Sequence, residues 1–578
     1  MKKNFKKSGQ KILRKFSRAS LRAGEEGKEH IKENLFGRVS HISNIRLLIL
    51  EWVLLVVALI LLAVTQAFWF GDSYAENTFV DGGAYTEATL GEVKSMNPLF
   101  AMTNSEKTLS RLMFSTISTM DYSGHMGEGL AKYIVSSDGN KTWTVKIRDG
   151  LKWSDGEDIT NEDIMFTIGL IKNPVVNSIY GSNFVNVKVT ENENQEIVFN
   201  LPVAYADFIS VLNIPVLPKH SLENADPKTL IEDSFSNAPV TSGAFSFNAM
   251  QTSATNDEQI IYLSSNPNYY NGKAMLNSFA VHTYNNIDDV INAVNSGAVT
   301  ATAELSGLDA DKITAGQFNR KESSLNSGAF LFFKTTSEIM KNAELRKAIR
   351  AGINIEEIRS IVPEAASLDY PILPQQIKLD NYPEIPAYDF EGAKSKISEL
   401  AGETPIHIEI ATVTTGYLPS VAEAVAEALR NLGLDVNVTS YQENQDFITN
   451  VISKRNYDIL IYEVEMGVEP DPLPYYHSSQ TNASGLNLSN YRNSLVDDLL
   501  LGARDATDDA LRAKKYEAFL EHWVDDVPAI GFYQSNLTYF YNKNVRTFDN
   551  NIKLVTVLDR FTDIDSWAVV KATKNKTP

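Results

Sequence analysis

The sequence has 578 residues, with 53 basic and 72 acidic side chains, a net charge of −19 and no cysteine. At roughly 150 residues per domain, this length predicts two to four structural units. The absence of cysteine excludes disulfides, thiolate metal sites, a cysteine nucleophile and a lipid-modified N-terminal cysteine, and the acidic charge argues against a nucleic-acid partner, whose phosphates would be repelled.

The N-terminal region predicts a membrane anchor. Residues 1–46 carry 13 basic and 4 acidic side chains, whereas the remainder carries 40 and 68, which gives net charges of +9 and −28. The uncharged run Trp52–Phe70 is nineteen residues long, close to the thickness of a bilayer core. The positive-inside rule then predicts a cytoplasmic segment at 1–46, a transmembrane helix within 47–70 and an extracytoplasmic remainder that begins with a tether at 71–81.

Two alternatives to this anchor are a buried core helix and a cleaved signal peptide. Ser73-Tyr74-Ala75 resembles a cleavage site of small residues. A basic region of 46 residues is long for a secretory signal, however, so we expect an uncleaved, single-pass anchor in the cytoplasmic membrane.

Short strands and a capped helix are predicted next along the chain. Thr142–Ile147 and Glu196–Leu201 are rich in strand-forming residues. Thr160 and Asp163 have the spacing of a capping box, which predicts the start of a helix. The apolar run at 208–217 does not form one clear element, because Pro215 interrupts it.

The region 404–464 predicts an alternating β-α-β-α-β unit. Alternating apolar residues at 406–410 and at 434–438 predict two strands, and a helix at 420–432 lies between them and ends before Gly433. A second helix at 445–454 precedes a third strand at 457–464. Such a unit implies a parallel sheet, which binds ligands beyond the carboxyl ends of its strands. We therefore expect a site at Glu463, Glu465 and the loop that reaches Asp471.

Enzyme motifs are absent from the sequence. It has no phosphate-binding glycine loop, no paired-histidine zinc motif and no nucleophile elbow. The eight histidines are scattered, and His220 and His477, near predicted loops, are expected to be structural. We therefore predict no catalytic residues, no metal ligands and no cofactor.

One stretch carries a family resemblance. Residues 138–148, followed by Lys152-Trp153-Ser154-Asp155-Gly156 and then Thr160 and Asp163, closely resemble the signature of the family 5 solute-binding proteins, the extracellular receptors of peptide and nickel ABC importers. Shorter matches to this family follow its order at 95–98, 128–131, 217–220, 239–245, 266–272, 346–349, 457–458 and 471–472. Together they cover about residues 82–570.

The resemblance implies an α/β, type 2 periplasmic-binding fold with two lobes and an extra subdomain in lobe one. Lobe one is expected at 82–333 with a return at 533–570, lobe two at 336–531, and a tail at 571–578. The two crossings between lobes are expected near Phe333–Thr335 and Phe532–Gln534.

The resemblance also implies ligand contacts. In lobe one, the family's ligand-binding positions fall on Met102, Thr103, Asn104, Ser242 and Gly243. The aspartate that often holds a peptide's amine in this family is replaced here by Val468, so this contact is not carried over. Carboxylates at Glu463, Glu465 or Glu469 are the substitutes we consider, and with the acidic outer domain they predict a preference for cationic ligands.

The expected function is therefore that of an extracytoplasmic, membrane-anchored receptor that delivers a small ligand, an oligopeptide by expectation, to the permease of an ABC importer. A sensory ectodomain of the same fold is the first alternative, and a hydrolase is the second. A receptor for nickel or haem remains a further subclass of the first reading.

Overall fold

The computed structural model describes residues 46–575, except 203–204, 206, 255–257, 363–364, 443–446, 484 and 507, and it omits the side chains of residues 46–49, 67–77, 182, 570 and 572–575. The chain divides into a compact unit at 79–571 and a smaller unit that includes the residues before 79. The predicted basic segment at 1–46 lies almost wholly outside the described residues.

The smaller unit contains one long helix. Helix α2 spans Arg46–Tyr74, and its large apolar side chains from Leu50 to Val64 are exposed. Strand β1 (Ala75–Val80) follows and forms a two-stranded sheet with β18 (Val570–Asn575). Among the described residues, the helices include none that combines the length and the apolar character of a membrane span. The span predicted at Trp52–Phe70 is therefore not shown, and its last side chains lie outside the described ones.

A ten-stranded sheet runs through the large unit in the order β15-β14-β16-β13-β17-β12-β2-β11-β10-β9. Its strands are β2 (Ala84–Leu90), β9 (Phe245–Thr252), β10 (Gln259–Ser265), β11 (Ser278–Tyr284), β12 (Ala301–Thr302), β13 (Phe318–Phe333), β14 (His407–Val413), β15 (Asp435–Tyr441), β16 (Ile459–Glu465) and β17 (Ala529–Asn542).

The two longest strands, β13 and β17, connect two hydrophobic cores. Phe318–Ser324 of β13 pairs with one half of β17, and Gly328–Phe332 pairs with the other half after a register shift. Leu325 belongs to the core that contains Tyr85 and Trp567, whereas Ala329 and the residues after it belong to the core that contains Val421 and Phe519. We call the parts of the chain around these two cores lobe one and lobe two. The core thus changes upstream of the expected crossing at Phe333–Thr335. The division into lobes at 82–333 and 336–531 stays a prediction.

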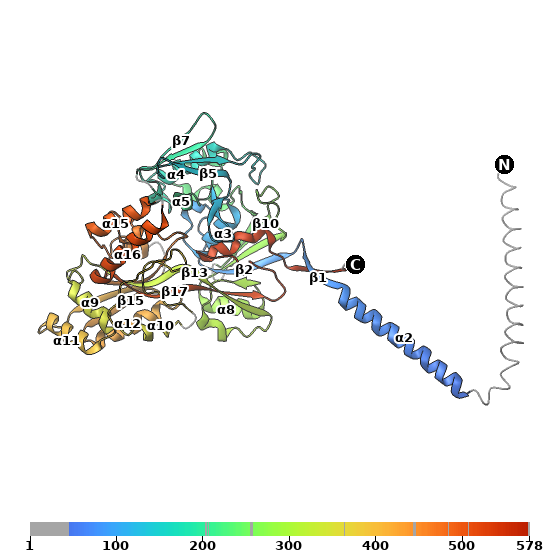
Figure 1. The fold of residues 1–578 in the computed structure, drawn as a ribbon. Helices are drawn as coiled ribbons and strands as arrows, with labels where there is room; N and C mark the ends of the chain where they lie inside the picture. Colours follow the sequence, from blue (N-terminus) through green and yellow to red (C-terminus); the bar gives the residue numbers. More distant parts are fainter. Residues whose placement is uncertain are drawn as a thin grey trace, which may run out of the picture. The chain divides into compact units, whose positions relative to one another are not determined.

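Lobe one carries a separate four-stranded sheet in the order β5-β6-β8-β7. Its strands are β5 (Ala131–Ser137), β6 (Thr142–Ile147), β7 (Lys188–Glu191) and β8 (Ile197–Asn200), and helix α4 (Asn161–Lys172) lies beside it in Figure 1. The predicted strands at 142–147 and 196–201 are confirmed, as is the capping box, in which the amide of Thr160 donates to Asp163 Oδ2 at 2.8 Å.

The predicted β-α-β-α-β unit forms in lobe two. Strand β14 pairs in parallel with both β15 and β16, and helix α12 (Leu418–Asn431) connects β14 to β15 and packs on all three strands. Gly433 follows this helix with φ of 94°, a conformation that favours glycine. Only a short helix at Ile448–Ile452 is described in the second connection, whose residues 443–446 lie outside the described residues.

The remaining elements complete the two lobes (Figure 1). They include β3 (Ser118–Met120), β4 (Met126–Glu128), α3 (Asn104–Met113), α5 (Phe208–Val211), α6 (Lys219–Leu222), α7 (Ser234–Asn237), α8 (Ile287–Ser296), α9 (Ala343–Gly352), α10 (Ile355–Arg359), α11 (Phe390–Ala401), α14 (Leu473–Tyr476), α15 (Ser494–Asp505), α16 (Asp509–Asp526) and the 3-10 helix η9 (Val557–Ser566).

Candidate functional site

Two cavities lie where residues of lobe one meet residues of lobe two. The first, about 470 Å³, is lined by α3, by residues 303–304 after β12, by the start of η9 and by Glu465 at the end of β16; we call it the α3 cavity. The second, about 400 Å³, is lined by residues 125, 126, 205, 207 and 209 of lobe one and by the 468–471 loop, α15 and α16 of lobe two; we call it the Arg504 cavity. Both volumes fall within the range of roughly 300–1,000 Å³ that is typical of ligand pockets.

Helix α3 forms one wall of the α3 cavity, and a capping box fixes its start. The Glu106 amide donates to Thr103 Oγ1 at 3.2 Å, while Glu106 Oε2 accepts from the amides of Thr103 and Met102 at 3.1 and 2.9 Å. The other oxygen of Glu106 accepts from the amides of residues 94 and 95, which ties the preceding loop to the helix. Met102 and Thr103 thus serve the helix start, and of the three predicted contacts here only Asn104 lines the cavity.

Glu304 and Asn104 lie side by side in the wall of this cavity. Asn104 Nδ2 donates to Glu304 Oε2 at 2.8 Å. Burial raises the pKa of Glu304 to about 7, although the Asn104 hydrogen bond and the Arg560 charge act in the opposite direction. This carboxylate is not predictable from the sequence, because the strand before it, β12, has only two residues. Strand β12 pairs with β2 in parallel, and the rule that ligands bind beyond the carboxyl ends of parallel strands would have indicated Glu304 had this strand been recognised.

Beneath the cavity, Arg560 and Glu87 form a buried ion pair. Arg560 Nη2 and Nε lie 2.7 and 3.1 Å from Glu87 Oε1, and their side chains are 2% and 0% exposed. Tyr539 donates to Glu87 Oε2 at 3.2 Å, and its hydroxyl lies 2.5 Å from that of Tyr85. Arg560 also lines the α3 cavity, but its charge is already balanced by Glu87.

The two glutamates predicted at the end of β16 take different positions. Glu463 is half-buried and accepts from Ser327 Oγ at 3.2 Å. Glu465 is exposed and lines the α3 cavity, while its backbone carbonyl accepts from Tyr475 Oη. Alternation along the continuous strand puts both residues on one face, as expected.

Asp471 lines the Arg504 cavity and is already paired. Arg504 Nη2 and Nε lie 2.5 and 3.1 Å from Asp471 Oδ2, and the guanidinium carbon lies 4.0 Å from the ring centre of Tyr205 in lobe one. Burial, together with the charges of Glu469 and Asp471, raises the pKa of Asp207 to about 7 against the hydrogen bond from Ser210. Val468, at the position of the family's amine-binding aspartate, lines this cavity.

Ser242 and Gly243 are placed in the interior, against the end of α3. The Ser115 amide donates to Ser242 Oγ at 2.9 Å, and the amides of Ser242 and Gly243 both donate to Met113 O at 3.0 and 2.7 Å. Neither residue lines either of the two cavities. Their predicted contact with ligand stays a prediction, and their observed role is to hold α3 in place.

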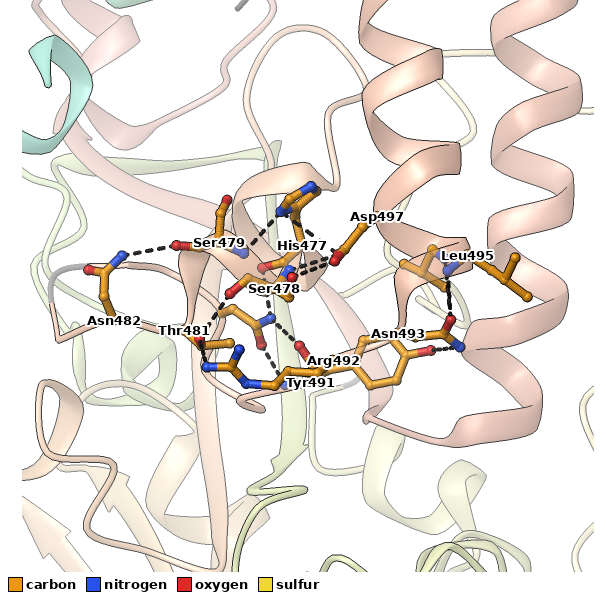
Figure 2. Close-up of polar contacts among 12 residues, drawn as sticks. His477, Ser478, Ser479, Thr481, Asn482, Tyr491, Arg492, Asn493, Leu495 and Asp497 are labelled. Carbon is orange, nitrogen blue, oxygen red and sulfur yellow. Dashed lines mark hydrogen bonds and ion pairs between the residues drawn. The ribbon is translucent and has the colours of Figure 1, made fainter. Parts of the chain in front are cut away.

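The two histidines near loops make local contacts. His220 Nε2 lies 2.9 Å from Asp155 Oδ2. Figure 2 shows that His477 Nδ1 accepts from the Ser479 amide at 3.0 Å, while the Ser478 hydroxyl donates to Asp497 and not to the imidazole. The serine, histidine and aspartate are therefore not arranged as a nucleophile and its base. In the described part of the chain, no three histidine or acidic side chains gather as a metal site.

Comparison with known proteins yields one family. Residues 126–487 match the family described as "Bacterial extracellular solute-binding proteins, family 5 Middle". The chain is 24% identical over 489 residues to the oligopeptide-binding protein AppA of Bacillus subtilis (strain 168), which covers 79% of this chain and 87% of that protein.

Solved structures agree on the fold. The structure of Bacillus subtilis AppA in complex with a nonapeptide covers 85% of this chain and 100% of its own, with a TM-score of 0.73 and 20% identity. The structure of NikZ from Campylobacter jejuni in complex with Ni(L-His) covers 84% and 99%, with a TM-score of 0.71 and 20% identity. The α/β periplasmic-binding architecture expected from the sequence is confirmed by these likenesses.

Proposed function

Because this chain belongs to the bacterial extracellular solute-binding proteins of family 5, we propose that it captures a small peptide outside the cytoplasm and presents it to the permease of an ABC importer. The observation that carries this function is the α3 cavity, to which both lobes contribute: α3, Glu304 and η9 from lobe one and Glu465 from lobe two. A ligand held there contacts both lobes only when they approach each other, so its binding would favour the closed arrangement. The name of AppA, an oligopeptide-binding protein, supports peptide as the ligand class.

The ligand's amine is proposed to bind at Glu465. This carboxylate is exposed, lines the α3 cavity and lies at the carboxyl end of a strand in a parallel pair. With Asn104 it forms the part of the predicted site that lies in the cavity. Glu463 lies on the same strand and accepts a hydrogen bond from Ser327, and Asp471 lines the Arg504 cavity. Met102 and Thr103 hold the start of α3, and Ser242 and Gly243 hold its end.

We further propose that α2 anchors the protein in the cytoplasmic membrane. The support is the uncharged sequence from Trp52 to Phe70 and the exposure of the apolar side chains between Leu50 and Val64. The basic residues before the helix favour a cytoplasmic N-terminus. Fractionation of cells that express the full chain tests the anchor: we expect the protein in the membrane fraction with its N-terminus intact, and a soluble form starting near Glu76 would contradict it.

Calorimetry on the full chain, freed of any copurified ligand by unfolding and refolding, tests peptide binding. Peptides of two to nine residues are titrated against a nickel–histidine complex and a disaccharide. We expect saturable binding of peptides alone. Binding of the nickel complex or the sugar without any peptide binding would reassign the ligand class.

N-acetylated peptides test the amine contact. The loss of the positive charge is expected to weaken binding at least tenfold in the wild type and to have no effect in Glu465→Gln. Equal affinities of free and acetylated peptides for the wild type would refute the cation preference.

A further inference from the structure

Helix α3 presents two cations to the α3 cavity. Lys107 and Arg111 are one helical turn apart, and both line the cavity. Within the described residues, neither side chain makes a hydrogen bond or an ion pair, and Arg111 is partly buried. Like charges four residues apart on a helix repel each other. Two unpaired cations on one wall therefore favour the entry of an anionic group.

The other ionised groups of this wall already have partners. Glu87 holds Arg560 at 2.7 Å. One oxygen of Asp559 accepts from the amides of Val555 and Thr556 and from the Thr556 hydroxyl, at 3.1, 2.7 and 3.1 Å. Burial raises the pKa of Asp559, and the charge of the nearby Arg111 partly offsets this rise. Asp559 and Arg111 thus interact through their charges without forming an ion pair. The hydrogen-bond donors of the guanidinium are therefore available to a ligand.

We propose that Arg111, assisted by Lys107, binds the C-terminal carboxylate of the peptide. A planar guanidinium can donate two parallel hydrogen bonds to one carboxylate, which makes arginine suited to such a contact. This assignment rests on the proposed peptide-binding function and adds to it a second, anionic recognition point. The amine end of the ligand, proposed above to bind Glu465, then lies at the Asn104 end of α3.

The spacing of Asn104 and Arg111 along α3 indicates the length of peptide that could reach both. Asn104 and Arg111 are seven residues apart, which corresponds to a rise of about 10 Å along a helix axis. An extended peptide spans about 3.3–3.6 Å per residue. A peptide of about three residues with both termini free therefore matches the separation of Asn104 and Arg111 along α3.

The test compares a mixed library of tripeptides with free C-termini and the same library with amidated C-termini. Thermal unfolding of the full chain is measured at equal library concentrations, because a ligand that binds the folded state raises the midpoint. For the wild type we expect a clear upward shift with the free acids and at most a tenth of the affinity with the amides. Failure of both libraries to shift the midpoint would refute the proposed peptide binding itself.

Variants separate Arg111 from the rest of the cavity. In Arg111→Gln, both libraries are expected to give the same small shift. Arg430→Gln, the same replacement on α12 at a residue that lines neither cavity, is expected to discriminate as the wild type does. Arg111→Lys keeps the charge and should retain a reduced preference for the acids. Equal shifts with acids and amides in the wild type, or full discrimination in Arg111→Gln, would overturn the assignment; the wild-type comparison needs no variant to fold.

Discussion

Replacement of Arg560 should lower the stability of lobe one more than the loss of any exposed ion pair would. Glu87 is 0% exposed and has two partners, Arg560 at 2.7 Å and Tyr539 at 3.2 Å. Arg560→Met leaves this carboxylate buried with only the tyrosine, and breaking a buried pair on one side typically costs about 3–5 kcal/mol. Domains of about 150–250 residues lose about 2–4 °C per kcal/mol, and the larger unit here should lose less, so the unfolding midpoint should fall by several degrees.

Tryptophan fluorescence follows this unfolding, and one of the six tryptophans, Trp567, packs beside the tyrosine that contacts Glu87. Trp567 is fully buried and packs on Tyr85 and Tyr539, whose ring centres lie 5.3 and 6.4 Å away. The double variant Glu87→Met with Arg560→Met leaves no buried charge, so we expect it to be more stable than Arg560→Met alone. A loss below about 1 kcal/mol in Arg560→Met, or a double variant whose loss equals the sum of the single ones, would show that Glu87 and Arg560 are not energetically coupled.

Three further outcomes follow from the site. The pKa of Glu304 in the folded state, about 7, lies above its ordinary 4.5, so protonated Glu304 stabilises the folded state fully below pH 4.5, and this stabilisation is lost as the pH rises through 7. Relative to Glu304→Gln, the unfolding free energy of the wild type should fall by about 2–3 kcal/mol between these pH values. Parallel pH profiles of the two proteins would contradict this. Gly243→Ala places a methyl group 2.5 Å from Leu112 O, so denaturant unfolding should show a loss of about 1–3 kcal/mol, whereas Gly139→Ala, beside which no atom lies within 4 Å but where φ is 60°, tests backbone strain alone. Small-angle scattering should show a smaller radius of gyration with saturating peptide, and an unchanged radius with proven binding would argue against closure.

The regular elements could be predicted because their signals are local. The alternating apolar residues before and after α12, and Gly433 after it, correspond to β14, β15 and the helix between them. The capping box at Thr160 and Asp163 is likewise contained in four residues. In such segments the alternation of buried residues and the capping side chains lie within a few neighbouring positions, so the sequence alone is sufficient to predict the element.

The site was predictable only in part, because it is assembled from distant segments. Glu465 was found from the rule for strand ends, and Asn104 from the family resemblance, and both line the α3 cavity. Glu304 and Arg560 were missed because their partners, Asn104 and Glu87, are separated from them by 200 and 473 residues. No spacing within the sequence indicates such pairs.

A structure of the complex would show whether a peptide binds between the two lobes. A crystal structure of residues 79–571 or of the full chain, with a bound tripeptide, should show the peptide in the α3 cavity, in contact with α3 of lobe one and Glu465 of lobe two. Its carboxylate should lie on Arg111 and its amine toward Glu304 and Glu465. A peptide found outside this cavity, or in contact with one lobe alone, would show that the α3 cavity is not the peptide-binding site.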